Sequence, residues 1–153
     1  MIITIEELKQ TQGKILGVDF GDVRTGLAVS DAARFLASGL GTIAPGGMDK
    51  TARAVADSVA EHRASAVVVG LPVNMNGSYG ERAEHVRIFA GLLEEKIPQT
   101  PICFMDERMT TMAASRFLNE TNTRGQKRKQ VIDTLSAQII LQNALDRLKN
   151  MQK

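Results

Sequence analysis

Residues 14–31 read KILGVDFGDVRTGLAVSD, and this stretch decides the fold. An apolar run from Ile15 to Val18 ends on an acid, Asp19, and a second apolar run follows a polar turn flanked by glycines. Two short runs joined by such a turn predict a β-hairpin. The first run is apolar at nearly every position, which is typical of a central strand buried on both faces. Asp19 therefore needs a partner, because an ionised carboxylate is costly to bury alone.

The composition is that of an ordinary globular protein. A length of 153 residues, with 43% hydrophobic and 24% charged, fits one domain that can bury a core. We expect a single domain over residues 1–153, in which residues 1–13 form a short extension before the first strand. No apolar run is long enough to suggest a membrane span, and the first ten residues carry two glutamates where a signal peptide would be positively charged. A cytoplasmic protein without a membrane partner is expected.

The net charge and the aromatic content do not identify a binding partner. The net charge of +2 does not by itself require a polyanionic ligand. Aromatic residues make up only 4% of the chain, with no tryptophan, so stacking on nucleic-acid bases is not expected to dominate any recognition.

After the hairpin, the chain alternates between strand-like and helix-like patterns. Strand patterns cover residues 35–43, 66–71 and 102–105; helical patterns cover 49–62, with Asp49 as its N-cap, 81–96, 110–119 and 130–149, with a polar, basic loop at 120–129. Strand, helix, strand, helix, strand predicts parallel βαβ units. The expected fold class is α/β: an antiparallel hairpin region extended by parallel strands, with helices packed on the sheet.

Three acidic positions stand out. Asp19 follows the first strand, Asp106-Glu107 follows the last, and Asp133 heads the apolar stripe of the last helix. Sites in open α/β sheets form at the carboxyl ends of strands, and carboxylates gathered there are best held by Mg²⁺ or Mn²⁺. One or two such ions are suited to phosphodiester hydrolysis. Singly, Asp106 fits a turn residue and Asp133 fits the helix dipole, so the joint placement carries the indication.

Basic residues accompany these acids. Arg24 and Arg108 flank them, and each is suited either to bind a phosphate bidentately or to pair with a neighbouring carboxylate. A second group falls within six positions just before Asp133 and would bind a nucleic-acid backbone without sequence preference, or form a solvated loop. Its members are Arg124, Lys127, Arg128 and Lys129.

Four stretches carry a family resemblance: LGVDFGDVRTGLAVSD, VVVGLPVNMNGSYGERAEHVRIFA, DERMTTMAA and KRKQVIDTLSAQIIL. In this order they resemble the successive motifs of the YqgF family, also called RuvX, over residues 14–148. The family is described as Holliday junction resolvases and as nucleases that mature the 5′ end of pre-16S ribosomal RNA. The resemblance implies a ribonuclease-H-like fold, with a five-stranded mixed sheet of three antiparallel and two parallel strands flanked by helices.

Carried over residue by residue, the resemblance implies catalytic and metal-binding acids at Asp19, Glu107 and Asp133. Asp106 is kept as the alternative second acid, because adjacent side chains on a strand face opposite ways. Where the family usually has two alanines after the helix acid, this chain has Ser136 and Ala137. Both residues are small, so a close approach of helix to sheet is preserved.

The leading hypothesis is a metal-dependent endonuclease acting on structured nucleic acid, with processing of pre-16S rRNA placed first. The alternative is a Holliday junction resolvase acting on branched DNA, which would be expected to work as a homodimer so that two sites cut two strands. A nucleic-acid-binding module without catalysis is a different class. An actin-like phosphotransferase, whose first strand and phosphate turn resemble residues 19–21, is disfavoured because the chain has no duplicated half.

Overall fold

The computed structural model describes residues 1–74, 76–107 and 125–151, with only the backbone at 125–133. Its centre is one sheet whose strands lie in the order β1-β6-β5-β2-β3-β4. The strands span Ile2–Ile3 (β1), Ile15–Asp19 (β2), Thr25–Ser30 (β3), Ala37–Ile43 (β4), Ala66–Leu71 (β5) and Ile102–Asp106 (β6). The predicted hairpin is confirmed, because β2, β3 and β4 pair antiparallel in turn. The other pairs, β2 with β5, β5 with β6 and β1 with β6, are parallel.

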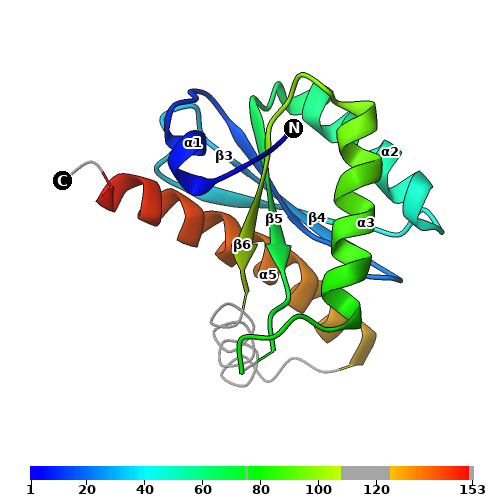
Figure 1. Cartoon of the computed structure of the whole chain (residues 1–153). Coiled ribbons are helices and arrows are strands. Elements are labelled where there is room, and N and C mark those ends of the chain that lie inside the picture. Colours follow the sequence, from blue (N-terminus) through cyan, green and yellow to red (C-terminus); the bar gives the residue numbers. More distant parts are fainter. Residues whose placement is uncertain (75, 108–124, 152–153) are drawn as a thin grey trace.

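Helices cover both faces of this sheet. They span Ile5–Lys9 (α1), Met48–His62 (α2), Glu81–Lys96 (α3) and Gly125–Asn150 (α5). In Figure 1, α2 and α3 lie on one face, whereas α1 and the long α5 lie on the other. Two buried apolar clusters, one under each pair of helices, form the core. This explains the unbroken apolar run of β2: Ile15 packs into the α5 cluster, and Leu16 and Val18 pack into the opposite one.

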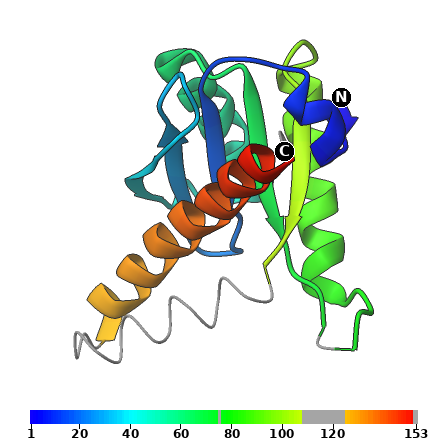
Figure 2. The same cartoon turned by 90° about the vertical axis from the view of Figure 1, so that its left-hand side faces the viewer.

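The close approach of α5 to the centre of the sheet depends on Gly17. A Cβ atom at this position would lie 2.8 Å from the Cβ of Leu141 and 3.2 Å from the carbonyl oxygen of Ala137. No side chain fits there without displacing the helix. Figure 2 shows the result, with α5 crossing the sheet diagonally.

The N-terminal segment is more than an extension. Ile2 and Ile3 pair with Ile102 and Cys103 of β6, so the sheet has six strands among the described residues, one more than predicted. Thr4 and Glu7 form a reciprocal capping box that starts α1. These elements escaped prediction because they are two and five residues long, too short to show a hydrophobic period.

The middle elements agree closely with the sequence patterns. The strand at 66–71 and the helix at 81–96 are confirmed as β5 and α3, and the third strand begins two residues later than expected, at Ala37. The predicted loop at 120–129 is wrong over 125–129, which is helical because α5 begins at Gly125. The helix expected at 110–119 lies outside the described residues.

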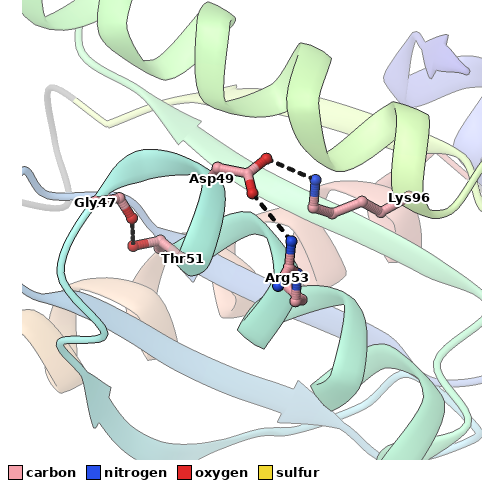
Figure 3. A network of polar contacts seen from close by, with 5 residues as sticks. All are labelled: Gly47, Asp49, Thr51, Arg53 and Lys96. Carbon is pink, nitrogen blue, oxygen red and sulfur yellow. Dashed lines mark hydrogen bonds and ion pairs between the residues drawn. The ribbon is translucent and has the colours of Figure 1, made fainter.

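Asp49 is not the N-cap of α2, as the sequence suggested. Gly47 occupies that position, and its carbonyl oxygen accepts a hydrogen bond from the hydroxyl of Thr51 at 2.8 Å. Asp49 lies in the first turn of the helix, where its carboxylate binds Lys96 of α3 at 2.8 Å and Arg53 at 3.3 Å (Figure 3). The acid therefore links the two helices that cover this face.

If α1 belongs to the core, Leu8→Ala should lower the free energy of unfolding by about 2–5 kcal/mol, the range for a buried leucine. Leu8 is fully buried in the α5 cluster. Leu36, with 68% of its surface exposed, provides the matched control, and Leu36→Ala should change stability by less than about 0.5 kcal/mol. Urea denaturation of both variants measures the difference; equal effects would show that α1 contributes little.

Candidate functional site

The carboxyl ends of three parallel strands meet at one edge of the sheet. The register pairs Val18 of β2 with Val69 of β5, and Leu71 of β5 with Asp106 of β6. Asp19 therefore ends β2 beside the last residues of β5, and Glu107 directly follows β6. Two of the predicted site positions, from distant parts of the chain, lie at the same edge.

Strand alternation places Glu107, rather than Asp106, on the face covered by α5. Cys103 and Met105 of β6 pack into the α5 cluster, and Glu107 follows with the same parity. Glu107 is only 7% exposed and its backbone N–H donates to the carbonyl oxygen of Leu71 at 3.3 Å, whereas Asp106 is exposed. These observations favour Glu107 as the second acid.

Asp19 faces the same side. Gly17, two residues earlier on β2, lies against Leu141 of α5, so the half-buried side chain of Asp19 is directed to the α5 face as well. The two acids thus lie on one face of the sheet, on strands separated only by β5.

Gly70 of β5 makes room between them. A Cβ atom on Gly70 would collide with Oε2 of Glu107 and with Cδ1 of Ile140 in α5. The carboxylate of Glu107 therefore lies over Gly70, and in the register Gly70 is one position beyond the pair of Val18 with Val69, next to Asp19. Because neighbouring strands are about 4.8 Å apart, this places the Glu107 carboxylate about one strand spacing from β2.

Asp133 lies within α5, the helix packed on this face. Ala137, whose carbonyl oxygen approaches Gly17, follows Asp133 by one helical turn. The side chains of residues 125–133 are not described, so the meeting of Asp133 with the other two acids stays a prediction. Among the described residues, no group of three or more His, Cys, Asp or Glu side chains is placed to hold a metal ion.

The electrostatics of Glu107 are unfavourable to its ionised form. Burial raises the pKa of this carboxyl, the charge of Arg82 acts in the opposite direction, and the neighbouring Asp106 raises it further. Arg82 lies exposed in the first turn of α3, and sequence reasoning missed it. The only indication in the sequence was that Arg82 lies two residues after Gly80, at the expected start of a helix. A buried carboxyl with a raised pKa is a common feature of functional sites.

Of the predicted basic residues, the structure describes the side chain of Arg24 but not those of the others. Arg24 is half-buried in the turn between β2 and β3, and its role in phosphate binding stays a prediction. In the same turn, Asp22 lies 3.4 Å from the Nδ1 of His85 in α3. Arg108 and Arg124 lie outside the described residues, and Lys127, Arg128 and Lys129 lie in α5 with undescribed side chains.

The loop after β5 is closed by its own polar groups. Asn74 donates to Ser78 both through the backbone N–H, at 2.8 Å to the carbonyl oxygen, and through the side-chain amide, at 3.0 Å to the hydroxyl. Gly77 donates back to the carbonyl oxygen of Asn74 at 2.8 Å. These hydrogen bonds are those of a structural turn.

Comparison with known proteins relates the whole chain to one family. The sequence model of the family described as "RuvX: Holliday junction resolvase" matches residues 13–147. Two relatives, each named "Putative pre-16S rRNA nuclease", come from Phenylobacterium zucineum and Caldanaerobacter subterraneus subsp. tengcongensis. The first is 40% identical over 98% of this chain and 97% of its own length, and the second is 45% identical over 90% and 99%.

Solved structures share the fold at low sequence identity. A structure described as T. thermophilus RuvC in complex with a Holliday junction substrate covers 88% of this chain and 95% of its own, with a TM-score of 0.55 and 16% identity. The expected α/β, ribonuclease-H-like architecture is confirmed, with the sixth strand added at its edge. No described helix is long and apolar enough to cross a membrane.

The raised pKa of Glu107 predicts a pH dependence of stability. The folded protein keeps the Glu107 proton at pH values where the unfolded chain has lost it. The contribution of this proton to stability is therefore full below the pKa of Glu107 in the unfolded chain. It is lost as the pH rises through the pKa of Glu107 in the folded protein. Glu107→Gln removes this titration. At neutral pH the variant should be more stable than the wild type, and this gain should shrink as the pH falls towards the ordinary pKa of a glutamate.

Urea denaturation at several pH values measures this difference. Glu61→Gln, on the exposed surface of α2, is the matched control for the change of side chain. A Gln variant of Glu107 that is less stable at neutral pH would contradict the electrostatic account.

Proposed function

The chain belongs to the RuvX family, and from this premise we propose that it is a metal-dependent endonuclease that processes the 5′ end of pre-16S rRNA. The relatives that match it over nearly their whole lengths carry the name of a pre-16S rRNA nuclease. We further propose that residues 1–153 act as one ribonuclease-H-like domain in the cytoplasm.

One observation carries the proposal: the Glu107 carboxylate is buried over Gly70, about one strand spacing from the strand that ends in Asp19. Burial raises the pKa of this acid, and it lies at the carboxyl edge of a parallel pair of strands, where sites form in open α/β sheets. The match to the family covers both residues and Asp133.

The donor set fits a hard divalent cation. Carboxylate oxygens are the ligands that Mg²⁺ and Mn²⁺ prefer, and a nearby cation would favour the ionised form of Glu107. We assign Asp19, Glu107 and Asp133 as the residues that hold one or two such ions. When bound, the metal supplies Lewis-acid stabilisation of phosphate charge and a more acidic water.

The protein's own part in the reaction is positioning and charge. The carboxylate of Glu107 occupies the space that the missing side chain of Gly70 leaves on β5, so we propose that one ligand position is set before a substrate arrives. The charge of Arg82, at the exposed start of α3, acts on this carboxyl, so we propose Arg82 as a phosphate contact, with Arg24 and Arg108 as further candidates. The basic group formed by Arg124, Lys127, Arg128 and Lys129 would hold the backbone of the polymer.

Resolution of Holliday junctions is the second candidate, because the family description names that activity. It would require a homodimer that presents two sites to two strands, whereas RNA processing would not. Measurement of the mass in solution, with and without a four-way junction, separates these cases. A binding module without catalysis would give tight, salt-sensitive binding and no turnover.

The direct test is cleavage of pre-16S RNA and of a four-way junction with Mg²⁺ or Mn²⁺. Asp19→Asn and Glu107→Gln should each lower the rate by at least about a hundredfold, since each removes a carboxylate ligand of the proposed metal ions. Asp106→Asn, which alters the exposed neighbour, is the matched control and should retain most activity. Full activity of Asp19→Asn would refute the site, and no cleavage of either substrate by the wild type would refute the function.

A second test concerns the basic group on α5. Changing Lys127, Arg128 and Lys129 to glutamine should weaken RNA binding and flatten its dependence on salt, by about 0.7–0.9 in log–log slope for each phosphate that is no longer neutralised. Lys50→Gln, an exposed lysine in α2, is the control and should leave the slope unchanged. An unchanged slope in the triple variant would show that these side chains do not bind the polymer.

A further inference from the structure

A hollow lies at the opposite end of the sheet from the candidate active site. It has a volume of about 680 Å³ and is lined by the end of α1, the segment before β2, the turn between β3 and β4, and the last turns of α5. Leu145 and Leu148 of α5 provide apolar lining. Its size falls within the range of small-molecule sites, roughly 300–1,000 Å³.

An exposed aromatic ring stands at this hollow on a rigid support. The turn between β3 and β4 is closed by Asp31, whose carboxylate accepts hydrogen bonds from the backbone N–H groups of Phe35, at 2.7 Å, and Leu36, at 3.0 Å. The carbonyl oxygen of Phe35 accepts from the side-chain amide of Gln142 at 3.0 Å. With its backbone held on both sides, Phe35 still leaves 55% of its surface exposed.

The charges that line the hollow are all positive among the described residues: Lys9, Arg34 and Lys149. Arg34 is committed to the structure, because its guanidinium donates to the carbonyl oxygens of Gly13, at 2.6 Å, and Thr11, at 2.9 Å. The two lysines, in the last turns of α1 and α5, make no ion pair with a carboxylate in the described part of the chain. Lys149 instead lies over the ring of Phe35, 4.9 Å from its centre.

An exposed ring lies beside two ammonium groups that pair with no described carboxylate, one of them over the ring itself, and beside an apolar lining. This set matches a ligand with a flat aromatic part and a phosphate. A nucleotide has both parts. We propose that this hollow is a nucleotide-binding site, in which the base stacks on Phe35 and the phosphate contacts Lys9 and Lys149. The nucleotide is either free or an unpaired residue of an RNA strand; the second case rests on the proposed function, since it makes the hollow a remote contact for the substrate.

Binding of adenosine 5′-monophosphate and of a short single-stranded oligoadenylate, measured by calorimetry without divalent metal, tests the proposal. Phe35→Ala should weaken binding by about tenfold or more, the scale of removing one base–aromatic stack. Lys149→Gln should also weaken binding, because it removes a charge that contacts the phosphate. Ile88→Ala, with a wild-type exposure of 54%, and Lys50→Gln are matched controls that should bind like the wild type. Phe35→Leu and a denaturation curve for each variant separate loss of stacking from loss of folding.

Each result separates the alternatives. Binding of the mononucleotide that depends on Phe35 supports a site for free nucleotides, and binding of the oligonucleotide alone, with the same dependence, supports a contact for the polymer. Binding of neither probe, or equal binding by wild type and Phe35→Ala, overturns the proposal, as does inorganic phosphate that binds as tightly as the nucleotide. Failure of all cleavage assays with Phe35-dependent binding intact would refute the nuclease function and leave this site standing.

Discussion

The contact of α5 with the middle of the sheet is the constraint on which the rest of the structure depends. It exists because two central strands carry glycines where the helix crosses: Gly17 on β2 meets Leu141 and Ala137, and Gly70 on β5 meets Ile140. Absence of a side chain allows dense packing at these points. One of these two gaps, at Gly70, also leaves space above the sheet for the Glu107 carboxylate, so core packing and the candidate site share this glycine.

Long periodic or β-branched segments were predictable from sequence because their hydrophobic pattern is set by the layers they separate. Helix α3 and strand β5 match their predicted bounds. The segments that escaped, β1 and α1, are short and are held by pairing with β6 and by burial of Leu8, contacts with distant residues that no local pattern reveals. The start of α5 was misjudged because a polar, basic, glycine-containing stretch is typical of a loop.

The candidate site was predictable in its residue types but not in its geometry. The sequence indicated that an acid at the end of β6 mattered, while choosing between Asp106 and Glu107 needed the strand register. Arg82 was not predicted because its electrostatic effect on Glu107 arises only when α3 packs on the sheet. The proposed role of Phe35 could not be predicted either, because a single aromatic residue in a turn carries no sequence pattern. Its hydrogen bond to Asp31 and its contact with Lys149 are visible only in the structure.

The place of β1 has a consequence for how the chain folds. Ile2 pairs with Ile102 of β6, the last strand in the sequence, so β1 joins the sheet only after β6 has formed. The hairpins of β2, β3 and β4 close over short distances and can form early, whereas β1 must wait for the last strand. Only two residue pairs hold β1 to β6, so local opening of the native state should cost least at this edge. The strand that joins the sheet last should therefore also be the first to detach from it.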